Sequence, residues 1–251
     1  MRTISVLVAA FKAERWLEDS IFSIKNQQLP DGWQLQLLIG VDACQSTLGK
    51  AKSFADDRCR VISMAENCGT YVTFNTLMNY ADGQLICRFD ADDVMFSGYL
   101  QNHIRCIELG ADMAMSWSIY TDSDLRPTSH VMAHSHYHPK EGLNRRSSEG
   151  QFVIKKSVWD RLGGFQPWVC AADTDFRERV MSSEGEIQVL EEFLYYRRTH
   201  PDSLTAATKT NFQSTLRKQI DARAACLASA YRERRRSVKI LAVTGAVNAI
   251  Y

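Results

Sequence analysis

Asp90, Asp92 and Asp93 directly follow residues 85–89, an apolar segment typical of a buried strand. Carboxylates gathered beyond the carboxyl end of a strand suit a hard divalent cation such as Mg²⁺ or Mn²⁺, and without one they repel one another. The alternative is an acidic turn in which Asp93 caps the next helix. The group therefore indicates either a metal site or a capped turn, and its context in the chain has to distinguish them.

The elements that must position these acids alternate between strands and helices. Apolar runs predict four strands, at residues 4–10, 35–41, 60–64 and 85–89. Helical periodicity predicts a helix after each of the first three strands. This order is typical of a right-handed doubly wound parallel sheet, whose ligands bind beyond the carboxyl ends of the strands. The second strand also closes on an acid, Asp42.

The second half of the chain mixes shorter elements with one long irregular region. The pattern predicts, in order, a helix at 99–109, a strand at 113–119, a strand at 151–154, a helix at 156–162, a helix at 171–180, and one or two strands at 186–196. Residues 120–149 lose periodicity, and a loop of this length is usually functional or mobile. His134, His136 and His138 alternate within it, but no acid or cysteine nearby completes a metal site. We interpret them as loop residues on the acceptor side.

Composition points to an intracellular globular protein. The chain has 251 residues, 45% hydrophobic and 24% charged, which suits one large α/β domain with an appendage. The seven cysteines are odd in number and form no Cys-x-x-Cys pair, which argues against a zinc cluster and a disulfide framework. Neither a signal peptide nor an apolar span long enough for a bilayer is evident. We therefore expect a cytoplasmic protein with reduced cysteines.

The net charge of +1 hides a basic C-terminal end. Residues 205–251 carry nine Lys and Arg against Asp221 and Glu233, a net of +7, which leaves −6 for residues 1–204. Helical pattern continues from Ala206 to about Lys239, and each cation near an anionic leaflet contributes on the order of 1 kcal/mol. We expect contact with the inner face of the cytoplasmic membrane, with a solvated helix packed on a partner as the alternative. Nucleic acid is not expected, because aromatic interleaving is absent.

Five motifs follow one another along residues 3–205. They are Val6 to Lys12, then Asn67, Gly69 and Asn75, then residues 81–83 with Asp90 to Asp93, then Gly163 to Phe165 with Ala172 to Asp175, and finally Tyr196 to Ser203. In this order they resemble the motifs of the inverting family-2 glycosyltransferases of GT-A fold. The resemblance implies a Rossmann-like α/β fold with a mainly parallel doubly wound sheet. It implies a GT-A domain at 1–205, with a nucleotide-binding half at 1–93 and an acceptor-binding half at 94–205, and leaves 206–251 as a basic helical extension.

The resemblance also implies a reaction. It is the metal-dependent, inverting transfer of a hexosyl or N-acetylhexosaminyl group from a nucleoside-diphosphate donor, expected to be a UDP-sugar. The acceptor would be a hydroxyl of a glycan or lipid-linked glycan in cell-surface polysaccharide synthesis. With Mn²⁺ or Mg²⁺ as cofactor, Asp92 would be a metal ligand, Asp90 would hold ribose or the water shell of the metal, and Asp93 would face the donor sugar. His200 would complete the metal shell or touch the diphosphate, or be a surface turn residue.

The same comparison implies a catalytic base. Asp173 would take the proton of the acceptor hydroxyl, while Asp175 is the competing candidate and a helix N-cap is the structural alternative for Asp173. The nucleoside would be bound by two groups of residues. These are Ala10, Phe11, Lys12, Glu14 and Asp42 at the first two strand ends, and Tyr71 and Asn75 on the third helix. For Glu14, a solvated charge in the first turn of a helix is an equal alternative. For Tyr71 and Asn75, core packing and helix capping are equal alternatives. Lys12 and Arg88 are the cations available to phosphates, and Arg88 has the alternative of neutralising the acids.

Five positions depart from the family pattern. They are Ala43, Cys44 with Gln45, Phe74 in place of a common arginine, and Ala172 in place of a common glutamate. These departures affect the donor more than the reaction. A nucleotidyltransferase is the first alternative, although Ala9 to Lys12 lacks the glycine-rich loop of that class. A non-catalytic glycan- or nucleotide-binding protein of the same fold is the second.

Overall fold

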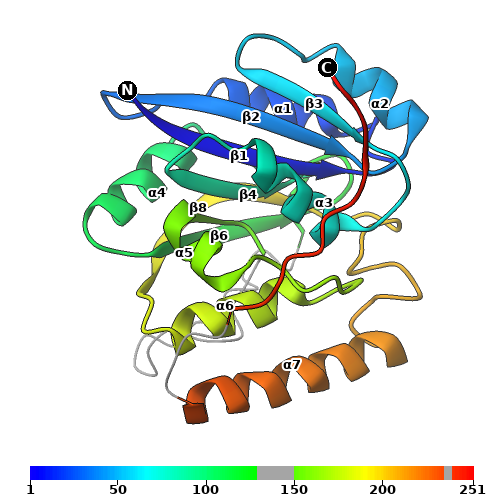
Figure 1. The fold of residues 1–251 in the computed structure, drawn as a ribbon. Helices are drawn as coiled ribbons and strands as arrows, with labels where there is room; N and C mark the ends of the chain where they lie inside the picture. The colour runs from blue at the N-terminus through cyan, green and yellow to red at the C-terminus, as the bar shows by residue number, and fades with distance from the viewer. Residues whose placement is uncertain (129–149, 235–238) are drawn as a thin grey trace.

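One nine-stranded sheet organises the part of the chain that the computed structural model describes, residues 1–128, 150–234 and 239–251 (Figure 1). The strand order is β5-β8-β6-β7-β4-β1-β2-β3-β9. The first half of the chain forms β1 (Arg2–Ala10), β2 (Trp33–Val41), β3 (Cys59–Met64) and β4 (Leu85–Asp90), which are mutually parallel. Helices α1 (Leu17–Lys25), α2 (Gln45–Lys52) and α3 (Thr70–Leu77) connect them. The predicted parallel sheet is confirmed.

Two apolar cores lie on the two faces of this sheet. On β1, Ile4, Val6 and Val8 pack into one core and Leu7 into the other, the period of two expected of a strand. The first core is covered by α1, α2 and α4 (Tyr99–Glu108), and the second by α3, α5 (Lys156–Leu162) and α6 (Ala172–Ser182). Because both faces are covered, the strands can be apolar throughout, which is why they were visible in the sequence.

The register aligns the carboxyl ends of three strands. Ala10 of β1 lies beside Val41 of β2, and Ala9 lies beside Asp90 of β4. The turns that leave these strands therefore begin at the same edge of the sheet. We call Asp90, Asp92 and Asp93 the acid triplet. The alignment of the strand ends brings the acid triplet, Lys12 and Asp42 to one region of the fold.

The second half extends the sheet beyond β4. β7 (Phe152–Lys155) is antiparallel to β4 and to β6 (Met113–Thr121), and β6 runs parallel to β8 (Ile187–Arg198). The two-residue β5 (Val94–Met95) follows the acid triplet and pairs with β8, while the short η1 (Met78–Tyr80) continues α3. The elements predicted at 99–119 and 151–196 are confirmed. The loop histidines His134, His136 and His138 lie outside the described residues.

The C-terminal segment differs from the continuous helix expected from Ala206. Residues 201–214 form successive turns, and α7 begins at Thr215 and ends at Arg234 beside α6. Ser214 caps it, because its hydroxyl accepts the Arg217 N–H at 3.2 Å. The chain then crosses the face of the domain to form β9 (Val247–Ile250), which is antiparallel to β3 at the edge of the sheet. A four-residue strand paired only at the edge leaves too weak a periodicity to predict.

The structure also bears on the expectations about the cysteines and about membrane-spanning segments. All seven cysteines, each within the described residues, are free thiols. None of the helices in residues 1–128, 150–234 and 239–251 combines the length and apolar character that crossing a bilayer requires. The predicted contact with an anionic membrane stays a prediction, because residues 235–238 of the basic run lie outside what is described.

Candidate active site

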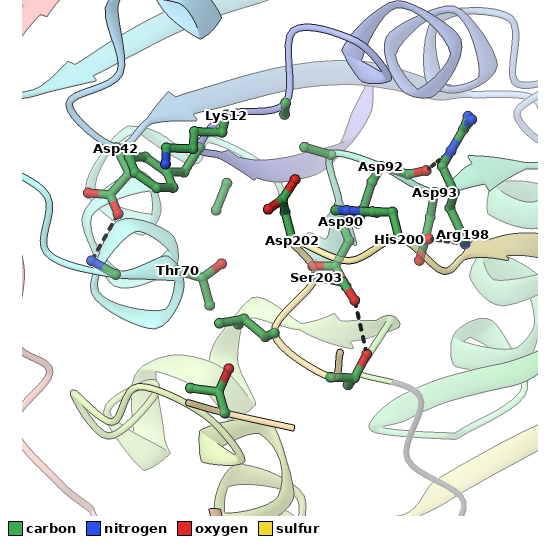
Figure 2. Close-up of a pocket in the computed structure, with 18 of the residues that line it drawn as sticks. Lys12, Asp42, Thr70, Asp90, Asp92, Asp93, Arg198, His200, Asp202 and Ser203 are labelled. Carbon is green, nitrogen blue, oxygen red and sulfur yellow. Dashed lines mark hydrogen bonds and ion pairs between the residues drawn. The ribbon is translucent and has the colours of Figure 1, made fainter. Parts of the chain in front are cut away.

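A cavity of about 410 Å³ opens where β1, β2 and β4 end (Figure 2). Its lining combines residues from the strand ends with residues from the connection between β8 and α7. The former include Lys12, Asp42, Arg88 and the acid triplet, and the latter include His200, Asp202, Ser203, Lys209 and Leu216. Lys12 and Asp42 lie at one end, and Asp92, Asp93 and His200 lie at the other. Lys12, Asp42, the acid triplet and His200, which were predicted from separate motifs, thus share one cavity.

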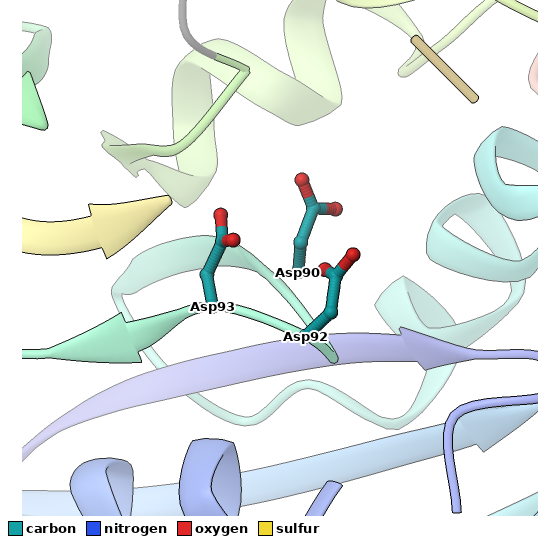
Figure 3. A group of neighbouring side chains, drawn as sticks. All are labelled: Asp90, Asp92 and Asp93. Atoms are coloured by element: carbon teal, nitrogen blue, oxygen red, sulfur yellow. The ribbon is translucent and has the colours of Figure 1, made fainter. Parts of the chain in front are cut away.

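The acid triplet projects toward the same side of the sheet (Figure 3). Each of the three carboxylates offers an oxygen, and these oxygens lie within 4.8 Å of one another. Asp90 and Asp92 are partly exposed, whereas Asp93 is 2% exposed. Burial raises the pKa of Asp93 well above its usual range, and the charges of Asp92 and Asp90 raise it further. The triplet is therefore a site that favours added positive charge.

Asp93 has protein partners on both oxygens. Oδ1 accepts the backbone N–H of Arg198 at 2.9 Å, and Oδ2 accepts Nε2 of Gln151. Gln151 Nε2 also donates to Asp90 Oδ2 at 3.0 Å. Asp93 is consequently a buried anchor of the site, while Asp90 and Asp92 are the carboxylates with exposed surface.

Asp92 is bound by a histidine from the far end of the chain. His200 Nε2 lies 2.8 Å from Asp92 Oδ2, and its ring stacks on Trp16 with the centroids 3.8 Å apart. Nδ1 of His200 is buried and has no hydrogen-bond partner in the structure. Arg198 Nε holds the Asp92 backbone by donating to its carbonyl at 2.8 Å. His200 therefore lies beside Asp92, and its expected role in the metal shell or at the diphosphate stays a prediction.

Asp42 is fixed at the opposite end of the cavity. It is 3% exposed, and its carboxylate accepts the backbone N–H of Cys68 at 2.8 Å and of Gly69 at 2.9 Å. Lys12 lines the same end and has a φ of +52°, an uncommon conformation for a residue with a side chain. Such backbone conformations cluster at functional sites. Phe11, which is 47% exposed, also lines this end.

Two other residues of this turn take structural positions. The carbonyl of Ala10 accepts the backbone N–H of Asp42 at 3.0 Å, and so ties β1 to β2. Glu14 is exposed and accepts the hydroxyl of Thr47 at 2.9 Å. Its pKa is lowered, chiefly by hydrogen bonding to the backbone N–H of Glu14 itself and to Thr47. Neither residue lines the cavity, so their predicted nucleotide contacts stay predictions.

Cys44 stands at the start of α2, beside the turn that follows Asp42. Burial raises the pKa of its thiol, but hydrogen bonds from Ser46, Thr47 and the Lys12 backbone outweigh burial and bring the pKa to about 7. Because the thiolate forms as the pH rises through 7, we expect iodoacetamide to modify Cys44 with a half-maximal rate near pH 7. Peptide mass spectrometry between pH 5 and 9 measures this. Cys68, whose pKa burial raises to about 11, is the matched unreactive control. A Cys44 rate that still climbs above pH 8 would contradict the assignment.

Asp173 and Asp175, the two base candidates, occupy different environments on α6. Asp175 is 0% exposed, and its carboxylate is 2.9 Å from Arg179 Nε and 3.1 Å from the hydroxyl of Tyr231. Asp173 is partly exposed and accepts the hydroxyl of Tyr71 on Oδ1 at 2.8 Å. Asp173 does not line the cavity itself. Asp175 is shielded from any acceptor, whereas Asp173 is not.

Tyr71 and Asn75, which are predicted to contact the nucleotide, lie on α3 and are not among the residues that line the cavity. Tyr71 is 5% exposed and points to Asp173; burial and the charge of Asp173 raise its pKa well above the usual value. Asn75 is 2% exposed, and its amide exchanges two hydrogen bonds with the backbone of Phe165, each 2.9 Å. Its Nδ2 also donates to the Val243 carbonyl at 3.1 Å. The amide of Asn75 joins α3 to the rest of the domain, and its expected contact with ribose or phosphate stays a prediction.

Several residues of the site were not foreseen. Trp16, Asp202 and Lys209 line the cavity, and Gln151 binds two acids of the triplet without being named as a candidate. Arg198, next to the closing motif, uses its guanidinium and backbone to hold Asp92, Asp93 and Asp19. The polar turn at 197–205 was the available signal for Arg198 and Asp202. Nothing in the pattern around Gln151 indicated that it reaches the acids.

The donor set fits a hard divalent cation. Two partly exposed aspartates and a histidine whose Nε2 faces Asp92 offer the oxygen and imidazole ligands that Mn²⁺ accepts, and Mg²⁺ fits the oxygens alone. The site has no cysteine among its lining residues, which disfavours a soft metal. Asp92 is the acid with the fewest protein partners and would be the first ligand.

A sheet whose first four strands are parallel, with an acidic cavity at their carboxyl edge, is the arrangement expected of the glycosyltransferases of GT-A fold. The model of the family described as glycosyl transferase family 2 matches residues 5–172. The chain belongs to glycosyl transferase family 2 and is a glycosyltransferase. This membership sets aside both the nucleotidyltransferase and the non-catalytic alternatives.

Related proteins and solved structures agree with this. An uncharacterized glycosyltransferase of Methanocaldococcus jannaschii, MJ1057, is 25% identical over 228 residues, 86% of this chain and 75% of that protein. The Escherichia coli glucosyltransferase WfgD is 28% identical over 101 residues, 40% of this chain and 39% of its own length. The crystal structure of S. aureus TarS 1-349 with UDP-GlcNAc shares the fold, with a TM-score of 0.71 at 14% identity, over 94% of this chain and 69% of that chain.

Proposed function

We propose that this enzyme transfers a sugar from a UDP-sugar to a hydroxyl of a glycan or lipid-linked glycan in cell-surface polysaccharide synthesis. The proposal rests chiefly on one observation: Asp42, Lys12 and the acid triplet line the same cavity. The names of similar proteins support the donor class, because TarS was solved with UDP and with UDP-GlcNAc. WfgD is named as a UDP-Glc:alpha-D-GlcNAc-diphosphoundecaprenol beta-1,3-glucosyltransferase, which supports a lipid-linked acceptor.

The donor would lie along the cavity with its base near Asp42. That carboxylate can accept a ring N–H, and its position is fixed by two backbone N–H groups. Lys12, on the same rim, would approach the phosphates. Residues 1–93 would therefore provide the nucleotide half and residues 94–205 the acceptor half, as the resemblance implied. The proposal is supported by the cavity, which Asp42, Lys12 and the acid triplet line together.

Asp92 and Asp90, with His200, would hold Mn²⁺ or Mg²⁺ beside the diphosphate. When bound, the cation would neutralise the negative charge that develops on the departing diphosphate. Asp93 would stay in its buried position and face the donor sugar from below. The Arg198 backbone N–H and the Gln151 amide orient Asp93, and Gln151 also donates to Asp90, before any ligand arrives.

Asp173 would act as the base on the acceptor side. As the acceptor hydroxyl attacks the anomeric carbon opposite the diphosphate, Asp173 takes its proton. The bond from the anomeric carbon to the diphosphate oxygen breaks, and the nucleoside diphosphate leaves with the electron pair. The new glycosidic bond has the inverted configuration. We choose Asp173 over Asp175 because Asp175 is buried in its pair with Arg179.

A donor panel tests the proposed reaction. The purified chain is incubated with UDP-, GDP- and ADP-sugars, with Mn²⁺ or with EDTA, and the released nucleotide is measured. We expect release of UDP from at least one UDP-sugar in Mn²⁺ and its loss in EDTA. The product anomer, read by NMR, is expected to be inverted relative to the donor. Pyrophosphate release, or equal turnover in EDTA, would contradict the proposal.

A further inference from the structure

Arg88 is a buried cation directly beneath the acid triplet. It lies on β4 two residues before Asp90, is 5% exposed, and has its guanidinium 4.9 Å from the ring centre of Phe74. Nη2 lies 2.7 Å from Asp90 Oδ1, and Nη1 lies 3.0 Å from Oδ2. Two parallel contacts between planar groups fix the rotation of the carboxylate as well as its position.

Gln151 extends this contact to the next acid. Arg88 Nη1 also donates to Gln151 Oε1 at 2.9 Å, and the amide nitrogen of Gln151 donates to Asp90 and Asp93. Because arginine can only donate, this contact settles which end of the amide faces it. Arg88 thus orients Gln151, and the amide nitrogen of Gln151 bridges the two acids.

Gly150 places Arg88 next to the proposed base. Its φ is +82°, and a Cβ built on it would lie 2.7 Å from Arg88 Nη1 and 3.0 Å from Asp173 Oδ2. The two side chains therefore border the same bare backbone. The other oxygen of Asp173 is held by Tyr71. Burial lowers the pKa of Arg88, but Asp90, Tyr71 and Asp173 together raise it above the usual value, so the residue stays charged.

We propose that Arg88 is a positioning residue that sets Asp90 on the donor side against Asp173 on the acceptor side. The inference rests on the proposed function and goes beyond it, because it assigns one fork-shaped cation to both halves of the site. A residue that only neutralised charge could be replaced by any buried cation. A residue that holds Asp90 by two parallel contacts and borders Asp173 across Gly150 needs the planar fork of arginine.

The variant Arg88→Lys separates these two roles, because it keeps the charge and removes the fork. In Mn²⁺ we expect its UDP affinity, measured by calorimetry, to fall about 10-fold or more, as for other residues that orient metal ligands. At saturating donor we expect transfer to slow by about 100-fold, since a small displacement of a reacting group has this effect. Arg161→Lys, at an exposed arginine of α5, is the matched control. Parental affinity and rate in Arg88→Lys would overturn the proposal.

Gly150→Ala tests the same contact from the other side and does not depend on how Arg88→Lys folds. Its methyl group would displace Arg88 and Asp173, so we expect slower transfer at saturating donor. Gly32→Ala is the control for backbone strain, because Gly32 has a φ of +81° and open space around it. Transfer by Gly150→Ala as fast as by Gly32→Ala would overturn the proposal. If the parent protein binds no UDP in Mn²⁺, the proposed function fails, and this inference fails with it. If the parent binds UDP and both variants bind and transfer as the parent does, only this inference is refuted.

Discussion

Asp173→Asn is expected to lower the rate of sugar transfer by about 10²- to 10⁴-fold, the usual contribution of a general base. Asparagine keeps the oxygen that accepts the Tyr71 hydroxyl, so the side chain can stay in place while losing its basicity. Donor binding should be unchanged, because no nucleotide-facing group is altered. The measurement is transfer at saturating donor, with UDP affinity measured in parallel.

The control for Asp173→Asn is Asp160→Asn on α5. Asp160 is an exposed aspartate, paired only with Lys156 within the described contacts, and it lies outside the cavity lining. We expect this control to transfer at the parental rate. Transfer at the parental rate by Asp173→Asn as well would mean that another group accepts the proton. Loss of UDP binding in that variant would assign Asp173 to the donor.

Asp92→Asn is expected to remove most of the metal-dependent part of UDP binding. Loss of a metal ligand should cost at least as much as loss of an outer partner, which is typically 10- to 100-fold. In the structure Asp92 is the partly exposed acid that His200 contacts, so the variant also leaves that imidazole with a weaker partner. The measurement is calorimetric titration of UDP in Mn²⁺ and in EDTA.

Asp202→Asn is the control for charge in the cavity. Asp202 lines the same cavity and is exposed, but it lies outside the triplet. We expect its UDP affinity in Mn²⁺ to stay within about twofold of the parent, as for an exposed charge that contributes little. An Asp92→Asn protein that binds UDP equally well in Mn²⁺ as the parent would show that the cation is held elsewhere.

The sheet was predictable because its strands are covered on both faces. Residues such as Val6, Leu38 and Phe89 are 0% exposed, so the segments that contain them are apolar without interruption. The same pattern predicted the edge of the sheet at which the site lies. Parallel strands end at one edge, and the acids come directly after β2 and at the end of β4. The sequence therefore located Asp42 and the acid triplet without any coordinates.

The contacts inside the site could not be read in this way. Tyr71 and Asp173 are 102 residues apart, and Asp92 and His200 are 108 residues apart, and no local periodicity encodes such contacts. Asn75 is a case in which the sequence predicted a ligand contact but did not show the backbone contacts that its amide makes. An asparagine on a helix near a site looks alike in sequence whether its amide faces a ligand or, as here, the backbone of Phe165.

A crystal soaked with MnCl₂ and UDP tests the central claim most directly. We expect an anomalous manganese peak in contact with Asp92 and with oxygens of both phosphates, and the uracil beside Asp42. We also expect Asp90 to keep its two contacts with Arg88. A manganese peak away from the acid triplet, or UDP bound in the cavity with the three acids still held only by their own chain, would contradict it.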